Sequence, residues 1–268
     1  VRFADATDNV GGAPRALAAS TTTGVDSRLS GVTLPRLLVG TARCSLWICA
    51  PPRTGKDAAP NGSSQELTAG HFADALAVEA HPLRPDVWAS AGSDRQLLLW
   101  KRGPRRTPVQ RAELSTGAAC LAFAPDGSLI AAGLLDGTIA LIKPTSLDYP
   151  ATEAAIVSRA ETATPQRDAR SALCDIKFSP GSGAHGGLLA TAGHDRVIDV
   201  YRIDPEGGGK VGVLLHQVAC CRGHTSTVTH LDWSTDGSML MSNCSAKEIL
   251  FWAMPAGKRM VSHSPSIA

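Results

Sequence analysis

Histidine, hydroxyl, carboxylate and tryptophan side chains recur at matched spacing in two stretches of this sequence. His71 and Trp100 are 29 positions apart, and His224 and Trp252 are 28 positions apart. Such groups can serve as acid, base or nucleophile in catalysis, or they can hold one another in a buried hydrogen-bond network. The first stretch contains one of each kind: His71, Ser90, Asp94 and Trp100.

A catalytic use would require a nucleophile or an acid–base pair with a partner that orients it. No carboxylate or cysteine pairs by spacing with His185 or His194, two histidines that have no place in the matched stretches. The Thr54-Gly55-Lys56 triplet also lacks the upstream glycine of a phosphate-binding loop. We therefore expect no enzyme activity, no catalytic residue and no cofactor.

The cysteines do not suggest a metal site. They are odd in number, form no Cys-x-x-Cys pair and lie mostly in strand-like runs, where cysteine behaves as a small core residue. We expect reduced thiols and no bound zinc, which would need closely spaced ligand pairs. The seven are Cys44, Cys49, Cys120, Cys174, Cys220, Cys221 and Cys244.

Short strands must position the matched residues. Between residues 218 and 252, apolar residues alternate with polar ones in three short runs separated by turns, which is typical of antiparallel strands joined by hairpins. A sheet this thin cannot bury both faces alone, so the chain must repeat it. Five such units are found, and they close at Cys49, Trp100, Ile142, Tyr201 and Trp252.

The length of the units resembles that of WD-repeat β-propeller blades, which take roughly 40–45 residues. We expect an all-β propeller with about five four-stranded blades, an incomplete arc of a seven-bladed ring. The expected boundaries are residues 1–62 with an N-terminal segment and a linker, 63–103, 104–148, 149–210, 211–257, and 258–268 as the start of a further blade. Residues 143–170 are expected to be an insertion that forms a mobile excursion or a binding loop.

In WD-repeat blades a His, a Ser or Thr, an Asp and a Trp form a hydrogen-bonded tetrad, and the resemblance gives that role to His71, Ser90, Asp94 and Trp100. Tyr201 replaces the tryptophan of the fourth unit, and Ala246 stands where the aspartate of the fifth is expected, which predicts a looser turn there. The partial sets consist of Asp136, Thr191, Asp195, His224, Ser242 and Trp252.

Several motifs narrow the resemblance to the echinoderm microtubule-associated protein-like family. Residues 223–226 (GHTS), 228–233 (VTHLDW) and 248–252 (EILFW) resemble one blade of that family, and residues 38–41 (LVGT) resemble another of its strands. The resemblance implies part of the second of two tandem propellers and an association with microtubules. Any oligomerisation would use segments absent from this sequence.

The hairpins offer a candidate binding surface. A basic residue lies beside the hairpin in four of the five units, with Gly137 as the exception, so these cations would attract an acidic partner such as tubulin. The alternative is that they are ordinary solvated turn residues. The candidate rim consists of Arg43, Arg95, Arg196 and Lys247.

Composition limits the partners further. The net charge of +2 argues against a protein that coats nucleic acid, and no apolar run approaches the ~20 residues that a membrane span needs. We expect a non-enzymatic scaffold that binds proteins, with microtubules favoured. Its expected location is the cytoplasm and its microtubules, with the cilium as a narrower option. The alternative function is an adaptor for another complex, either in ciliary assembly or as the substrate receptor of a ubiquitin ligase.

Overall fold

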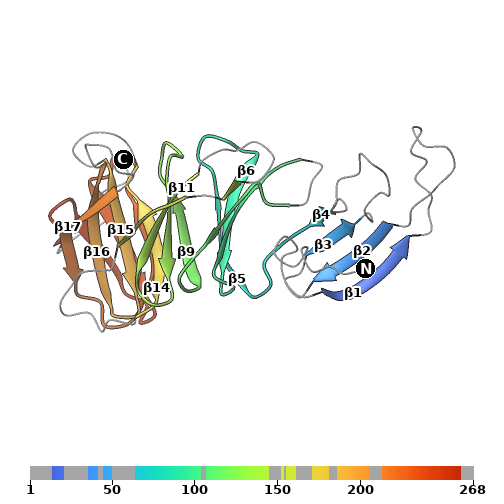
Figure 1. The fold of residues 1–268 in the computed structure, drawn as a ribbon. Coiled ribbons are helices and arrows are strands. Elements are labelled where there is room, and N and C mark those ends of the chain that lie inside the picture. Colours follow the sequence, from blue (N-terminus) through green and yellow to red (C-terminus); the bar gives the residue numbers. More distant parts are fainter. Residues whose placement is uncertain are drawn as a thin grey trace. The chain divides into compact units, whose positions relative to one another are not determined.

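The computed structural model describes residues 14–20, 36–41, 45–49, 64–103, 107–144, 152–153, 155–160, 171–180, 186–205 and 213–260. These residues form strands and turns arranged in five sheets (Figure 1). The described part of the chain contains no helix long and apolar enough to cross a membrane. The strands belong to two compact units, residues 1–72 with 102–108 and residues 73–101 with 109–268.

The sheet of the first unit has four antiparallel strands in chain order. The first strand, which begins at Pro14, lies at one edge of this sheet. The strands are β1 (Pro14–Ser20), β2 (Arg36–Thr41), β3 (Leu46–Cys49) and β4 (Ser64–Thr68).

The second unit holds four sheets, each built from hairpins that follow one another along the chain. The second sheet comprises β5 (Ala75–Ala80), β6 (Val87–Gly92), β7 (Gln96–Lys101) and β8 (Gln110–Glu113), with the short β12 (Thr152–Glu153) parallel to β8. The third comprises β9 (Ala118–Phe123), β10 (Ile130–Leu134), β11 (Ile139–Lys143) and β13 (Ala155–Ala160). The fourth comprises β14 (Leu173–Phe178), β15 (Leu188–Gly193), β16 (Val197–Pro205) and β17 (Val213–Arg222). The fifth comprises β18 (Val228–Trp233), β19 (Met239–Cys244), β20 (Ile249–Ala253) and β21 (Lys258–Arg259).

The outer strands are offset from the sequence units. β4, β8 and β17 each lie at the sequence start of an expected unit, yet each pairs with the last strand of the unit before it. The expectation of a mobile or binding loop at 143–170 is wrong for residues 152–153 and 155–160, which form β12 and β13. β13 pairs along β11, so the backbone hydrogen bonds of that segment complete the third sheet.

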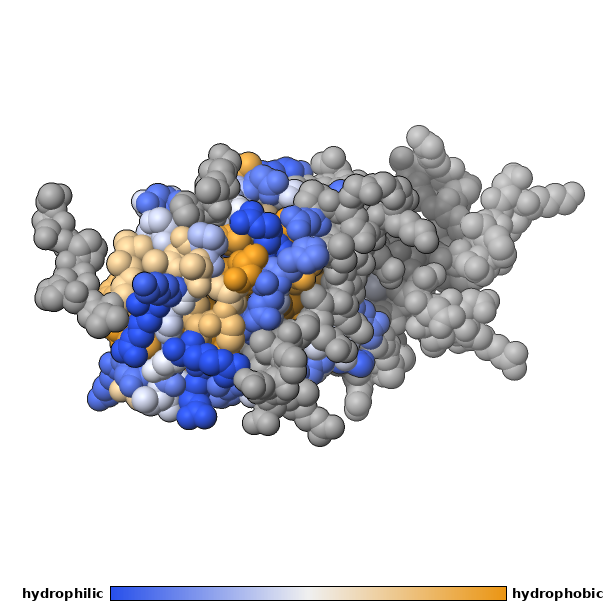
Figure 2. Space-filling view, turned by 90° about the vertical axis from the view of Figure 1, so that its left-hand side faces the viewer, coloured by the Kyte–Doolittle hydropathy of each residue, from blue (hydrophilic) through white to orange (hydrophobic). Residues whose placement is uncertain are grey.

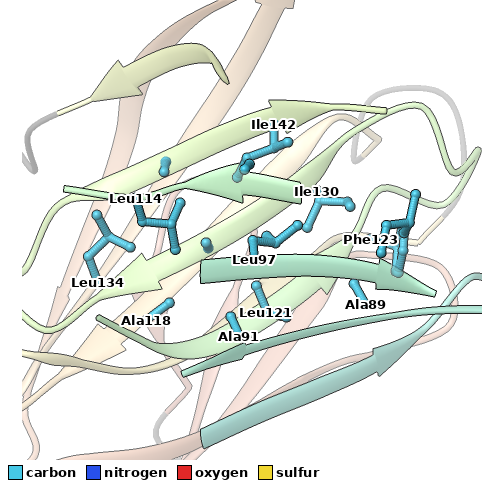
Figure 3. Packing of buried hydrophobic residues seen from close by; sticks show 14 of the residues in the cluster. Ala89, Ala91, Leu97, Leu114, Ala118, Leu121, Phe123, Ile130, Leu134 and Ile142 are labelled. Carbon is cyan, nitrogen blue, oxygen red and sulfur yellow. The ribbon is translucent and has the colours of Figure 1, made fainter. Parts of the chain in front are cut away.

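The sheets of the second unit stack side by side. Their first strands, β5, β9, β14 and β18, are neighbours in that order. Figure 1 shows the second, third and fourth sheets one after another, at the labels β5 and β6, β9 and β11, and β14 to β17. The buried residues between the second and third sheets interlock in one apolar cluster, drawn in Figure 3. This cluster includes Leu97, Leu99, Leu121, Ile130 and Leu134.

Single strands supply side chains to two layers at once. In β10, Ile130 and Ala132 pack toward the second sheet, whereas Ala131 packs toward the fourth sheet with Leu173 and Ile176. This follows from the alternation of side chains along a strand. A third cluster joins the fourth and fifth sheets through Leu188, Ile198, Leu231, Leu240 and Trp252. The expected all-β class with stacked four-stranded blades is therefore confirmed.

Polar groups also cross the boundary between the fourth and fifth sheets. The buried Asp175 carboxylate accepts hydrogen bonds from the backbone N–H of Ile176 at 2.9 Å and of Leu231 at 2.8 Å. The Trp233 indole N–H donates to the carbonyl of Lys177 at 3.2 Å. Burial raises the pKa of Asp175 above its ordinary 3.8, against the opposing effect of these hydrogen bonds.

Replacing Asp175 by alanine tests this link. We expect Asp175→Ala to lower the free energy of unfolding at pH 7 by about 2 kcal/mol, because the Leu231 N–H is left buried without a partner. The raised pKa means that the folded wild type binds a proton more readily than the unfolded chain. The difference in free energy of unfolding between the wild type and the variant should therefore increase as the pH falls from 7 toward 4.

Denaturant unfolding at several pH values measures both effects, and Asp232→Ala, at an exposed aspartate on the neighbouring strand, is the matched control. A gap that narrows as the pH falls would contradict the assignment.

Candidate functional site

The hydrogen-bond network of the second sheet centres on Ser90. The Trp100 indole N–H donates to Ser90 Oγ at 2.8 Å, and the Trp100 ring stacks on Trp88 with centroids 6.5 Å apart. The buried Asp94 accepts the backbone N–H of Gln96 at 3.1 Å, which closes the β6–β7 hairpin. His71 is half-buried and lies in the first compact unit, after β4.

The fifth sheet repeats this network around Ser242. His224 Nε2 lies 2.7 Å from Ser242 Oγ, and the Trp252 indole N–H donates to the same oxygen at 2.8 Å. All three side chains are buried. The structure thus brings His224, Ser242 and Trp252 together, as the sequence suggested.

The third and fourth sheets keep only parts of the network. Asp136 accepts both the backbone N–H and the hydroxyl of Thr138, at 3.0 and 2.6 Å, and Asp195 accepts the backbone N–H of Val197 at 3.2 Å. Thr191 is fully buried, and its hydroxyl has no hydrogen-bond partner among the described residues. Tyr201, in the position of the tryptophan, donates instead to Asp199 at 3.5 Å.

Glu248 takes over the missing carboxylate of the fifth hairpin, a role that the sequence did not suggest. It accepts the backbone N–H and the hydroxyl of Thr225, each at 2.9 Å, and so ties the loop before β18 to the hairpin. These hydrogen bonds lower the pKa of Glu248 to about 2. The looser turn expected at Ala246 is wrong, because the Lys247 N–H donates to the Cys244 carbonyl at 2.9 Å.

The candidate rim residues share an unusual backbone conformation. Arg95, Arg196 and Lys247 have φ angles of 63°, 67° and 64°, and Gly137 has 84° at the corresponding turn position of the third sheet. This left-handed region costs a residue with a side chain about 1 kcal/mol relative to glycine. The chain therefore keeps a cation at three hairpins where glycine would be less strained. Arg43, the fourth predicted cation, lies outside the described residues.

The three described rim cations are exposed to solvent. The Arg95 guanidinium lies 3.6 Å from the Glu113 carboxylate, and these two side chains are 56% and 78% exposed. Because exposed ion pairs contribute little, this contact leaves Arg95 able to exchange Glu113 for a partner's carboxylate.

Comparison with known proteins identifies the family. Residues 75–267 match the family model described as the echinoderm microtubule-associated protein second beta-propeller. The chain belongs to the echinoderm microtubule-associated protein family.

Individual family members are similar to this chain over about three quarters of its length. The chain is 30% identical to echinoderm microtubule-associated protein-like 2 of Rattus norvegicus over 196 residues, which covers 73% of this chain and 26% of the relative. It is 28% identical to the 77 kDa echinoderm microtubule-associated protein of Strongylocentrotus purpuratus over 200 residues, with 75% and 26% covered. The chain thus spans about a quarter of the length of these family members.

Replacing Ser242 by alanine tests the network in this family member. We expect Ser242→Ala to lower the free energy of unfolding by about 2–3 kcal/mol, because Trp252 Nε1 and His224 Nε2 would both lose their buried partner. Thermal and denaturant unfolding measure the change. The control is Ser245→Ala at an exposed turn position, which should stay within about 0.5 kcal/mol of wild type. Equal effects of the two substitutions would show that Ser242 does not hold the network together.

Proposed function

We propose that this chain is a non-catalytic scaffold that binds proteins through its hairpin rim, and that its preferred partner is the acidic surface of microtubules. The rim is defined as Arg95, Arg196 and Lys247, with Arg43 as a predicted fourth member. The carrying observation is that these three described cations occupy left-handed turn positions. The expected location is the cytoplasm and its microtubules, with the cilium as a narrower possibility.

Backbone cost supports a binding role over chance. Gly137 occupies the same turn position in the third hairpin, so the fold accepts glycine there. If the side chains at the other three hairpins had no use, substitution to glycine would relieve strain in each turn. Backbone strain that persists at exposed positions is often connected with function.

Electrostatics supports the same conclusion. The three cations lie at corresponding hairpins of the second, fourth and fifth sheets, and the third sheet, whose hairpin carries Gly137, stacks between the second and the fourth. The Asp94 carboxylate behind one of them is buried and bound to its own hairpin, so it presents little charge to solvent. A surface of this kind attracts acidic partners and gives salt-dependent binding. The names of the relatives describe them as associated with microtubules.

The test uses the triple variant Arg95→Gly, Arg196→Gly, Lys247→Gly in the full-length protein. Glycine suits the turn, so the variant should be at least as stable as wild type. Losing three exposed ion pairs of about 0.5 kcal/mol each should weaken microtubule co-sedimentation about 10-fold at low salt. The dependence of binding on salt should also become weaker.

A matched control removes three cations from the opposite ends of the strands: Arg84→Gln, Lys143→Gln, Arg202→Gln. Arg84 lies in the β5–β6 turn, Lys143 at the end of β11, and Arg202 in β16 beside the start of β15. All three are at the ends of the strands opposite to the hairpins that carry the rim. The control should co-sediment as wild type does. Unchanged sedimentation of the glycine variant at low salt would reject the rim, and would favour an adaptor for another protein complex.

A further inference from the structure

Three potential metal ligands meet behind the fifth hairpin. His224 comes from the loop before β18, Cys244 ends β19, and Glu248 directly precedes β20. One ligand atom of each lies within 4.8 Å of the other two. The Glu248 Oε2 atom is 3.2 Å from Cys244 Sγ and 3.6 Å from His224 Nδ1.

The imidazole of His224 has one nitrogen without a hydrogen bond. Its side chain is only 1% exposed, and Nδ1 is a buried atom with no hydrogen-bond partner among the described residues. The other nitrogen faces Ser242 Oγ, which donates to the Leu250 carbonyl. Which of the two atoms donates depends on the tautomer, and in the tautomer with the proton on Nε2 the lone pair of Nδ1 faces the Glu248 carboxylate 3.6 Å away. A buried imidazole nitrogen that faces a carboxylate is stabilised by a positive charge between the two atoms, which either a proton or a metal ion can supply.

The distances fit a small divalent ion. Zinc bonds of about 2.0–2.3 Å in a tetrahedral arrangement separate neighbouring ligand atoms by about 3.3–3.6 Å. The two separations from Glu248 Oε2 are close to these values. Thr225 and Ser242 hold the glutamate and the histidine from outside, as second partners of metal ligands commonly do.

We propose that His224, Cys244 and Glu248 bind a single zinc ion through Nδ1, Sγ and Oε2, with a fourth position left for water or a partner's side chain. On binding, the Cys244 thiol releases its proton to solvent, and its hydrogen bond to Glu248 is replaced by the metal bonds. The inference does not depend on the proposed function.

The site is specific to this hairpin among the four described in the second unit. The other three carry Asp94, Asp136 and Asp195 where this one has Ala246. Two positions earlier they have Gly92, Leu134 and Gly193, whereas this one has Cys244. The hairpin has thus exchanged the usual carboxylate for a thiol and a glutamate. Sequence spacing predicted no zinc site, because these ligands do not form closely spaced pairs.

The test adds zinc chloride or cobalt chloride to the reduced, chelator-treated chain. We expect one equivalent of zinc by calorimetry, a thiolate-to-cobalt charge-transfer band, and a melting temperature that rises with zinc concentration. Cys244→Ser should abolish the band and weaken zinc binding at least about 10-fold. Cys220→Ser, which removes an exposed thiol on β17, should change neither.

Alkylation of the unsubstituted chain keeps the proposal testable if Cys244→Ser does not fold. Zinc should slow the modification of Cys244 relative to Cys220, as read by peptide mass spectrometry. The proposal is overturned if zinc protects neither cysteine, or if the cobalt band persists in Cys244→Ser and so belongs to another thiol.

Discussion

Burial of each sheet between its neighbours is the constraint on which the second unit depends. A four-stranded sheet with apolar residues on both faces is stable in water only when both faces are covered. Alternate side chains of β10 enter two different layers, so the third sheet is held from both sides. The hydrogen bond from the Leu231 N–H to the Asp175 carboxylate adds a directional contact, which fixes the position of the fifth sheet along the fourth.

The positions of the hairpins follow from this stacking of the sheets. Neighbouring first strands place corresponding turns at the same end of their sheets, and each turn requires a left-handed residue. One turn position therefore decides whether a hairpin presents a cation or glycine. The adjoining residues of the fifth hairpin, Cys244 and Glu248, meet His224 because the entering loop is tied to the hairpin through Thr225. The rim and the proposed zinc site are thus two consequences of the same local geometry.

Much of this could be predicted because its signals are local. Period-two alternation located the strands that close near Trp100 and Trp252, and the pairing of a closing strand with the strand before it brings Ser90 to Trp100. Contacts between distant segments left no such signal. Asp175 reaches an amide 56 residues away, and β13 is held by backbone pairing that any side chain permits. Glu248 replaces an aspartate only because its longer side chain returns to the entering loop.

Native-state hydrogen exchange at the Leu231 amide tests the stacking most directly. This amide is buried and bonded to Asp175 across the boundary between two sheets, so it should open only when the stack itself unfolds. We predict that Leu231 exchanges among the slowest amides of the chain, far more slowly than Lys258 and Arg259 in the exposed strand β21. Exchange of Leu231 as fast as in β21 would contradict the stacked arrangement.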